Sequence, residues 1–223
     1  MQTTIQTVPT SSWRNGLANL SGASVNLREV RLSDAAALFA HLATEEVARF
    51  ISPPPANVEG FEKFIAWAIR EREAGTTVCF AVTLSDDTAI GIFQVRALEA
   101  DFGLAEWGFA LGSAYWGTGI FMEGAELVLN YAFEILGVHR LEARAAVKNG
   151  RGNGALRKLR AVQEGLLRCS MCRNGVYLDQ LLWTILDSEW QDWRGLEDAR
   201  RPVDVSLPHV PAGVLHSTPR HVN

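Results

Sequence analysis

Apolar and polar residues change their spacing several times along the chain, and each spacing predicts a type of element. Apolar residues at every second position predict half-buried strands, whereas apolar residues three or four apart predict helices with one buried face. The helical spacing occurs in a segment after Ser33 and in residues 45–50, 58–74, 120–136, 152–160 and 187–193. Strands are predicted for residues 25–30, 78–84, 89–98, 104–111, 139–147, 162–172 and 176–186, and apolar and polar residues alternate clearly at 25–30.

The connections between these elements predict how the strands are arranged. Residues 85–88 (SDDT) and the Asn174-Gly175 pair are turn sequences that join neighbouring antiparallel strands. Strand 104–111, helix 120–136 and strand 139–147 follow one another, which predicts a right-handed crossover with two parallel strands at the sheet centre. The helix is apolar nearly all round, so we expect it to be buried against the sheet.

The predicted elements form one domain with additions at both ends. The chain has 223 residues, of which 48% are hydrophobic and 21% are charged, as is typical of one globular domain. We expect an α/β (α+β) domain over residues 25–194, with a mixed, mostly antiparallel sheet of about seven strands flanked by helices. Residues 1–24 are expected to form an N-terminal arm that Trp13 and Leu20 fix to the domain. The proline-bearing residues 195–223 are expected to form a flexible tail.

Charge and hydropathy exclude several classes of function. The formal net charge is −4 and no basic run stands out, so nucleic acid is not an expected partner. No apolar run reaches the roughly 18 to 20 residues that span a bilayer, and residues 1–24 lack the apolar core of a signal peptide. These features predict a cytoplasmic protein with no membrane partner.

Cysteine and histidine predict no metal site. Cys169 and Cys172 form a C-x-x-C, but no second pair completes a zinc site. Residues three apart in a strand point to opposite faces, so we interpret both cysteines, like Cys79, as packing residues. The histidines are scattered along the chain and suggest neither a metal cluster nor a catalytic triad.

The segment with the clearest chemistry is the turn Trp116-Gly117-Thr118-Gly119, which leads directly into helix 120–136. Glycine allows positive φ and a close approach of the backbone to a ligand. The first amides of a helix have no partner within the helix and lie at the positive end of its dipole, so this turn can bind a phosphate or pyrophosphate. The alternative is a helix that merely begins after a glycine turn. A P-loop nucleotide hydrolase is excluded, because no G-K-[ST] follows the glycines.

Three patches together resemble one family. The first is AEWGFALGSAYWGTGIFMEGAELVLNYAFEILGVHRLEARAAVKN, the second is NGRGNGALRKLRAVQEG, and the third is YLDQLLWTIL followed by Glu189-Trp190. With the order of elements, they resemble the GNAT superfamily of acyl-CoA-dependent N-acetyltransferases, and most closely its RimJ/RimL-type branch of ribosomal-protein N-terminal acetyltransferases. The resemblance covers about residues 24–193.

The resemblance implies a GNAT fold with the parallel strand pair at an acetyl-CoA cleft. It also implies direct transfer of the acetyl group to a primary amine, on a protein N-terminus or a small molecule, with CoA as product and a homodimer as one option. In such a site the pyrophosphate is held by backbone amides, here those of Trp116, Gly117, Thr118, Gly119 and Ile120. The strand end that pairs with the pantetheine arm and supplies an oxyanion donor comprises Phe109, Ala110 and Leu111.

The polar candidates implied by the resemblance each have a second interpretation. Asn149, and less directly Asn153, would bind the pantetheine, although Asn149 is also a suitable helix N-cap. Glu106 would be the general base, directly or through water, or else a carboxylate on the solvent face of the sheet. Tyr115 and Ser113 would protonate the leaving thiolate, or are ordinary loop residues.

Two positions depart from the family pattern. Ala114 occupies the first position of the pyrophosphate motif, where a Gln or Arg is usual, and Gly152 replaces a serine that often lies near the cofactor thiol. Because Gly152 has no hydroxyl, the alternative function is a catalytically degenerate GNAT-fold protein that binds acyl-CoA as a sensor or scaffold.

Overall fold

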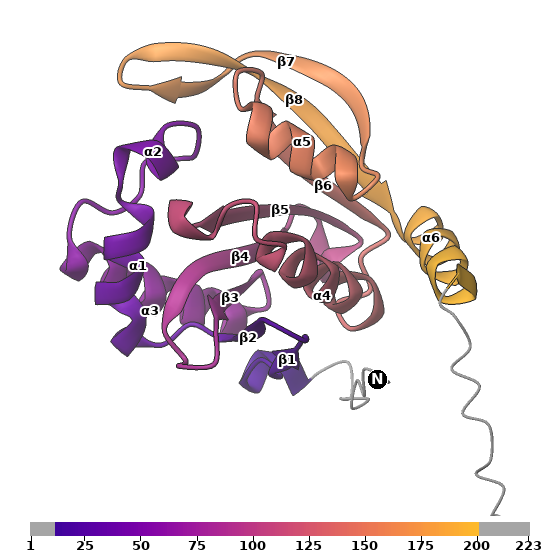
Figure 1. Cartoon of the computed structure of the whole chain (residues 1–223), viewed down its shortest axis with the longest axis horizontal. Helices are drawn as coiled ribbons and strands as arrows, with labels where there is room; N and C mark the ends of the chain where they lie inside the picture. Colours follow the sequence, from indigo (N-terminus) through magenta and orange to yellow (C-terminus); the bar gives the residue numbers. More distant parts are fainter. Residues whose placement is uncertain (1–11, 201–223) are drawn as a thin grey trace, which may run out of the picture.

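The structure, a computed structural model, describes residues 12–200, and its helices and strands follow the order shown in Figure 1. The strands are β1 (Leu20–Ser21), β2 (Asn26–Glu29), β3 (Thr77–Thr83), β4 (Ala89–Ala97), β5 (Leu104–Leu111), β6 (Arg140–Ala146), β7 (Val162–Arg173) and β8 (Val176–Leu186). The α-helices are α1 (Ala35–Leu42), α2 (Glu45–Ala48), α3 (Val58–Ala74), α4 (Ile120–Glu134), α5 (Gly150–Lys158) and α6 (Asp187–Arg200). Short 3₁₀ turns are η1 (Ser12–Asn15), η2 (Leu32–Asp34), η3 (Ala100–Phe102) and η4 (Ser113–Tyr115).

All eight strands form one sheet, in the order β1-β2-β3-β4-β5-β6-β8-β7. β5 and β6 are parallel, and every other neighbouring pair is antiparallel. The predicted mixed sheet with a central parallel pair is therefore confirmed. The eighth strand is β1, which lies in the predicted arm and is only two residues long, too short to leave a periodic pattern.

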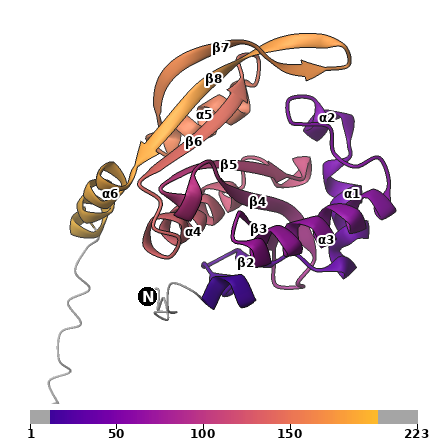
Figure 2. The same cartoon turned by 180° about the vertical axis from the view of Figure 1, so that it is seen from behind.

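Helices cover the sheet on opposite faces, as Figures 1 and 2 show from two sides. Alternate residues of β3 belong to different cores. Val78, Phe80 and Val82 pack with α4 in one hydrophobic cluster. Cys79 and Ala81 pack with α1 and α3 in the other. Because both faces are covered, every residue of β3 is buried.

Helix α3 begins and ends where the sequence predicts, and its caps explain why. The Asn57 side chain accepts a hydrogen bond from the Gly60 amide at 2.8 Å, which satisfies one of the free amides of the first turn. Gly75 ends the helix in the left-handed conformation, at φ 80°, where glycine is strongly favoured.

The N-terminal arm is attached to the domain by Trp13, as predicted. Its side chain is buried and meets Phe102 edge-on, with 5.5 Å between ring centroids. Arg72 of α3 adds a polar attachment, because its guanidinium bonds both the Glu29 carboxylate and the Arg14 carbonyl. Residues 1–11 of the predicted arm lie outside the described residues.

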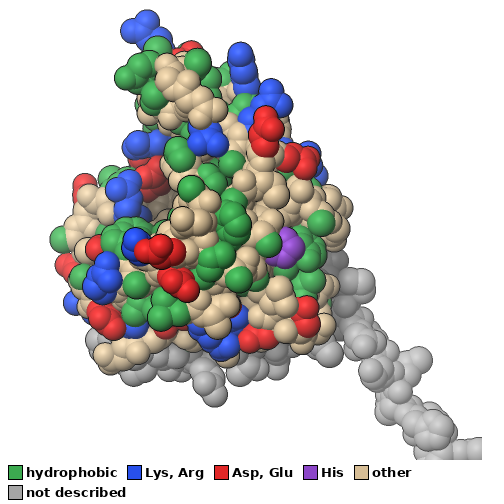
Figure 3. All heavy atoms as spheres, turned by 90° about the vertical axis from the view of Figure 1, so that its left-hand side faces the viewer, with side chains coloured by type: hydrophobic (Ala, Val, Ile, Leu, Met, Phe, Trp, Pro, Cys, Tyr) green, Lys and Arg blue, Asp and Glu red, His purple; other side chains and the backbone are tan. Residues whose placement is uncertain are grey.

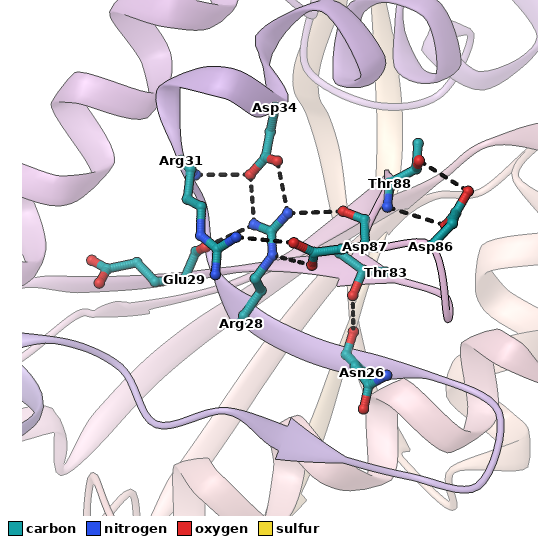
Figure 4. Close-up of polar contacts among 9 residues, drawn as sticks. All are labelled: Asn26, Arg28, Glu29, Arg31, Asp34, Thr83, Asp86, Asp87 and Thr88. Atoms are coloured by element: carbon teal, nitrogen blue, oxygen red, sulfur yellow. Dashed lines mark hydrogen bonds and ion pairs between the residues drawn. The ribbon is translucent and has the colours of Figure 1, made fainter.

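A closed ion-pair network fixes the corner between β2, η2 and the β3–β4 turn (Figure 4). The buried Arg28 guanidinium donates to both carboxylate oxygens of Asp34, each at 2.8 Å, and to Asp87 at 2.6 Å. Arg31 completes the network with a 2.9 Å bond to the other oxygen of Asp87. The bond to Asp34 raises the pKa of Arg28, and the bond from Arg28 lowers the pKa of Asp87. We call this set the β2 corner.

The C-terminal hairpin of β7 and β8 confirms one prediction and corrects another. Asn174 and Gly175 both have positive φ, 50° and 77°, as a two-residue hairpin turn requires. Cys169 and Cys172 are exposed, so the interpretation of these two as packing residues is wrong. β7 is an edge strand with a register shift between Leu167 and Met171, and its residues lie beyond the cover of the helices.

Further expectations can be compared with the described residues. Cys79 is a buried packing residue as predicted, and burial raises the pKa of its thiol to about 12. α6 continues past the predicted end at residue 193 to Arg200, and the rest of the predicted tail lies outside the described range. Within residues 12–200 there is no group of three or more candidate metal ligands, and no helix has the length and apolar character to cross a bilayer.

Candidate active site

The central feature of the site is an opening between the two parallel strands. β5 pairs with β6 only over Leu104–Glu106 and Arg140–Glu142, whereas it pairs with β4 along its whole length from Ala105 to Leu111. Beyond Glu106 the strands part, and β6, β8 and β7 diverge from the rest of the sheet toward α2 (Figure 1). The last residues of β5 therefore have no strand partner on the β6 side.

The direction of each peptide decides which groups line this opening. The Ala110 carbonyl faces β4, because a Cβ added at Gly91 of β4 would lie 2.5 Å from that oxygen. Successive residues of a strand direct their backbone polar groups to opposite edges, so those of Phe109 and Leu111 face the opening. Of the three predicted pantetheine-pairing residues, Phe109 and Leu111 are placed to form backbone hydrogen bonds there, and Ala110 is not.

The glycine turn lies at the mouth of the opening and has the predicted geometry. Gly117 and Gly119 have φ of 77° and 92°, and a Cβ on either would meet no atom within 4 Å, so the space beside the turn is open. Gly119 is the N-cap of α4 and provides no side-chain cap, so the first amides of the helix remain available. The nearest carboxylate on the helix, that of Glu123, accepts a hydrogen bond from the Ser24 amide instead.

Trp116 ties the turn to the rest of the site. Its indole Nε1 donates to the Leu111 carbonyl at 2.8 Å, and its ring packs against both hydrophobic clusters. The Arg151 guanidinium, in the first turn of α5, lies over the same ring at 4.0 Å from its centroid. The neighbouring Thr118 hydroxyl donates to the Tyr115 carbonyl at 2.7 Å, which closes the turn that leads into Ile120.

Tyr115 and Ser113, the predicted proton donors, lie in η4, which connects β5 to the glycine turn. Tyr115 is half-buried and meets His41 of α1 edge-on, with 5.6 Å between ring centroids. His41 also touches the start of the turn, since a Cβ added at Gly112 would lie 3.2 Å from its ring. No sequence signal points to His41, because it lies on a helix far from residues 113–119 in the sequence and no motif surrounds it.

Asn149 and Asn153 lie at the start of α5, but their side chains are engaged within the protein. The Asn149 side chain caps the helix by accepting from the Gly152 amide at 2.9 Å, as in the second interpretation given above. Asn153 is buried, donates to the Ala146 and Asn149 carbonyls, and accepts from the indole of Trp183 at 2.9 Å. A Cβ at Gly152 would lie 2.6 Å from the Asn149 amide nitrogen, so the absence of a side chain there accommodates the cap.

Glu106 lies where β5 and β6 part, on the face opposite α4. Its side chain is 20% exposed, and its oxygens meet Arg96 of β4 at 2.6 Å and Arg144 of β6 at 3.6 Å. Glu142 stands opposite Glu106 in the register and pairs with Arg140 and Arg144 at 3.1 and 3.9 Å. The predicted base is therefore one member of a row of charges along this face.

The row ends at Glu164 of β7. This carboxylate accepts two hydrogen bonds from Arg140, at 2.9 and 2.6 Å, and one from Thr184 at 2.7 Å. The bonds from Arg140, and then that from Thr184, lower the pKa of Glu164 to about 2. Glu142 and Glu164 are therefore both held in ion pairs on this face of the sheet.

A hollow of about 340 Å³ lies beside the opening, between α2 and the tip of the β7–β8 hairpin. Figure 3 views this side of the molecule: the hairpin projects at the top, with basic side chains on it and on the surface below. The residues that line the hollow, which we call the α2 hollow, are Glu45, Arg49, Phe50, Lys148, Arg173, Asn174, Val176 and Leu178.

A mixed sheet that parts at a parallel pair, with a glycine turn and an uncapped helix at the mouth, is the arrangement of the GNAT fold. Sequence comparison agrees: a family profile described as "Acetyltransferase (GNAT) domain" matches residues 24–162. The chain belongs to this family of acetyltransferases.

Individual relatives support the same assignment. The chain is 26% identical over 168 residues to "Uncharacterized N-acetyltransferase p20" of Bacillus licheniformis, which covers 74% of this chain and 94% of the relative. The fold of the present chain is similar to that of RimJ from Mycobacterium smegmatis, which was solved in complex with CoA-disulfide. The TM-score is 0.70 and the identity 22%, and the match covers 79% of this chain and 90% of RimJ. The fold is also similar to that of the ribosomal-protein-S5-alanine acetyltransferase of Vibrio fischeri (TM-score 0.70, 19% identity, 78% and 99%). The predicted membership of the GNAT family is confirmed by the profile, and these two solved structures share the fold of the chain.

Proposed function

We propose that this protein is an acetyl-CoA-dependent N-acetyltransferase that moves the acetyl group directly to a primary amine. The observation that carries the proposal is the parting of β5 and β6 directly beside the glycine turn. A free strand edge suits an amide-bearing arm such as pantetheine, and an uncapped helix N-terminus suits a pyrophosphate. The two features adjoin because the Trp116 indole binds the last carbonyl of β5.

The chain's own groups fit this cofactor. The amides of Trp116 to Ile120 would hold the pyrophosphate, because Gly117 and Gly119 leave the space beside them open. The inward-facing amides of Phe109 and Leu111 would pair with the arm, and one of them would stabilise the oxyanion. We leave Asn153 out of the proposed cofactor site, since its amide nitrogen and oxygen both have protein partners.

Acetyl-CoA supplies a thioester whose carbonyl carbon accepts the amine. In the transfer a C–N bond forms and the C–S bond breaks, the amine loses one proton, and the departing thiolate gains one. Glu106 would take the amine proton, directly or through water, because it lies where the strands part and on the side of the sheet opposite α4. Tyr115 or Ser113 in η4 would give a proton to the sulfur of the departing thiolate. One of these hydroxyls would be needed because Gly152, which has none, replaces the serine that often lies near the cofactor thiol.

Positioning can supply much of the rate. Effective molarities of about 10⁵ M or more are reached when two reactants are held in line, so a modest acid–base set is compatible with turnover. The half-buried Tyr115 is held by the His41 ring, and Glu106 by Arg96 and Arg144, so both side chains have fixed orientations.

Binding and turnover test the proposal in two steps. In a thermal-shift assay we expect acetyl-CoA and CoA to raise the melting temperature and ATP to have a smaller effect. Thiol release from acetyl-CoA in the presence of primary amines should then show turnover. No stabilisation by either CoA species would contradict the proposed cofactor. Stabilisation without thiol release, for any amine, would instead support the sensor or scaffold alternative.

A further inference from the structure

The α2 hollow has an excess of positive charge that the proposed transfer does not require. Arg49, Lys148 and Arg173 line it, together with a single carboxylate, Glu45. Among the described residues, none of these three cations forms an ion pair with a carboxylate, and Arg49 contacts the Phe50 ring at 5.1 Å instead.

Several arginines elsewhere in the described part of the chain pair with carboxylates. Arg28 pairs with Asp34 and Asp87, and Arg140 pairs with Glu142 and Glu164. Several cations that converge without partners repel one another, and an anion between them relieves that repulsion. The α2 hollow therefore attracts negative charge.

The hollow is also close to the proposed reaction centre. Lys148 follows β6 directly and precedes Asn149, the N-cap of α5. α2 follows α1, whose His41 touches the turn that carries Tyr115. The hollow thus adjoins the end of the sheet at which β5 and β6 part, and its volume is at the lower end of the range of about 300 to 1,000 Å³ for small-ligand sites.

We propose that the α2 hollow selects acceptor amines that carry a carboxylate near the amine, with Arg49 and Arg173 as the main specificity-determining residues. This inference rests on the proposed acetyltransferase function. The carboxylate can belong to a free amino acid or to an acidic side chain beside a peptide N-terminus, because both present the same group to the guanidinium ions. Phe50, Val176 and Leu178 supply apolar walls for the carbon atoms between the two charges.

Two pairs of acceptors test the inference and separate the two sources of the carboxylate. Alanine and alaninamide differ in the α-carboxylate, and the amidated dipeptides Ala-Glu and Ala-Gln differ in the side-chain charge. Thiol release gives kcat/KM for each acceptor at saturating acetyl-CoA. We expect the anionic member of at least one pair to be preferred by about tenfold, the effect of two partly exposed ion pairs. The preference should fall as salt rises from 50 to about 500 mM, because salt screens exposed charges.

The double variant Arg49→Gln/Arg173→Gln provides the decisive comparison. It should reduce the preference to less than about threefold while leaving kcat/KM for the neutral acceptor and KM for acetyl-CoA within about twofold of wild type. Arg168→Gln is the matched control, since Arg168 is an exposed cation on the same hairpin that does not line the hollow. It should keep the full preference.

Other outcomes would overturn the inference without touching the proposed function. Equal rates for both members of each pair in the wild-type protein would show that the hollow does not select charge, as would a preference unchanged in the double variant. A raised KM for acetyl-CoA in the double variant would show that the cations bind cofactor phosphates instead. Failure of the proposed function itself is distinguishable, because the wild-type protein would then not be stabilised by CoA or acetyl-CoA at all.

Discussion

The β2 corner and the α2 hollow are both rich in arginine, but they use it differently. At the corner, the Arg28 and Asp34 side chains are 7% and 6% exposed and satisfy each other through two parallel hydrogen bonds. At the hollow, Arg49 and Arg173 line a depression and form no ion pair with a carboxylate among the described residues. Buried charges that bind each other hold a fold together, whereas open charges of one sign remain available for a ligand.

Glu106 lies between these two extremes. It is ion-paired like the residues of the β2 corner, but it stands where β5 and β6 part, and its partner Arg96 is 54% exposed. The Glu106 carboxylate therefore has two candidate roles, one as an ion-pair partner that stabilises the sheet and one as the general base of the transfer.

The largest effect on stability is expected from breaking the β2 corner. Asp34→Ala removes two charge-assisted hydrogen bonds of the buried Arg28 guanidinium and the acceptor of the Arg31 amide, and it leaves Asp87 as the remaining carboxylate partner of Arg28. This loss should cost about 3 kcal/mol. Urea unfolding measures this as a lower midpoint. Asp86→Ala, which removes only contacts to Thr88 in an exposed turn, is the control and should cost less than about 1 kcal/mol. Equal losses for the two variants would contradict the role given to the corner.

Glu106→Gln is expected to affect catalysis and not folding, and its free-energy effect should be smaller than that of breaking the β2 corner. If Glu106 is the base, kcat/KM should fall about 100-fold while CoA binding is kept, because the change removes a proton acceptor and not a cofactor contact. Glu142→Gln is the matched control, since Glu142 lies opposite Glu106 and shares its contact with Arg144. Similar small losses in both variants, with an unchanged pH–rate profile, would assign Glu106 to the solvent-face network.

The smallest effect is expected for Arg140→Gln at the outer end of the row of charges, and it concerns how folding stability depends on pH. In the folded protein the pKa of Glu164 is lowered to about 2, below its unfolded value of about 4.3. The carboxylate therefore stabilises the fold fully above about pH 4.3, and this contribution is lost as the pH falls toward 2. Arg140→Gln should remove most of the shift, so the variant should lose less stability than wild type between pH 4.5 and 2.5. A Glu164 pKa that stays near 2 in the variant, measured by NMR titration, would contradict the assignment to Arg140.

Most of the fold was predictable because local signals agreed with the tertiary structure. The apolar run of β3, the apolar face of α3 and the Asn174-Gly175 turn each act over a few residues, and each was confirmed. β1 was missed because two residues have no period. The exposure of Cys169 and Cys172 was missed because it depends on β7 being an edge strand with a register shift, which is a property of the whole sheet.

The site was predictable where backbone geometry decides it and less so where side chains meet. The glycine turn has its predicted conformation, because Gly117 and Gly119 readily adopt the positive φ that the turn requires. Sequence spacing cannot show that Asn153 is committed to Trp183, or that His41 approaches Tyr115, because those partners come from distant parts of the chain. The α2 hollow was not foreseen for the same reason, as its cations come from three separate segments.

The central claim is that the glycine turn beside the β5–β6 opening binds the pyrophosphate of acetyl-CoA. Calorimetric titration of acetyl-CoA into the Gly117→Glu variant tests this claim most directly. Gly137→Glu is the matched control, because Gly137 has a similar φ of 73° and open space around it but lies beyond the other end of α4. Both variants carry the same backbone strain and the same added charge. We predict that Gly117→Glu weakens binding by more than about 100-fold, since a carboxylate would face the pyrophosphate, while Gly137→Glu binds within about threefold of wild type. Wild-type affinity in Gly117→Glu would place the cofactor elsewhere and contradict the claim.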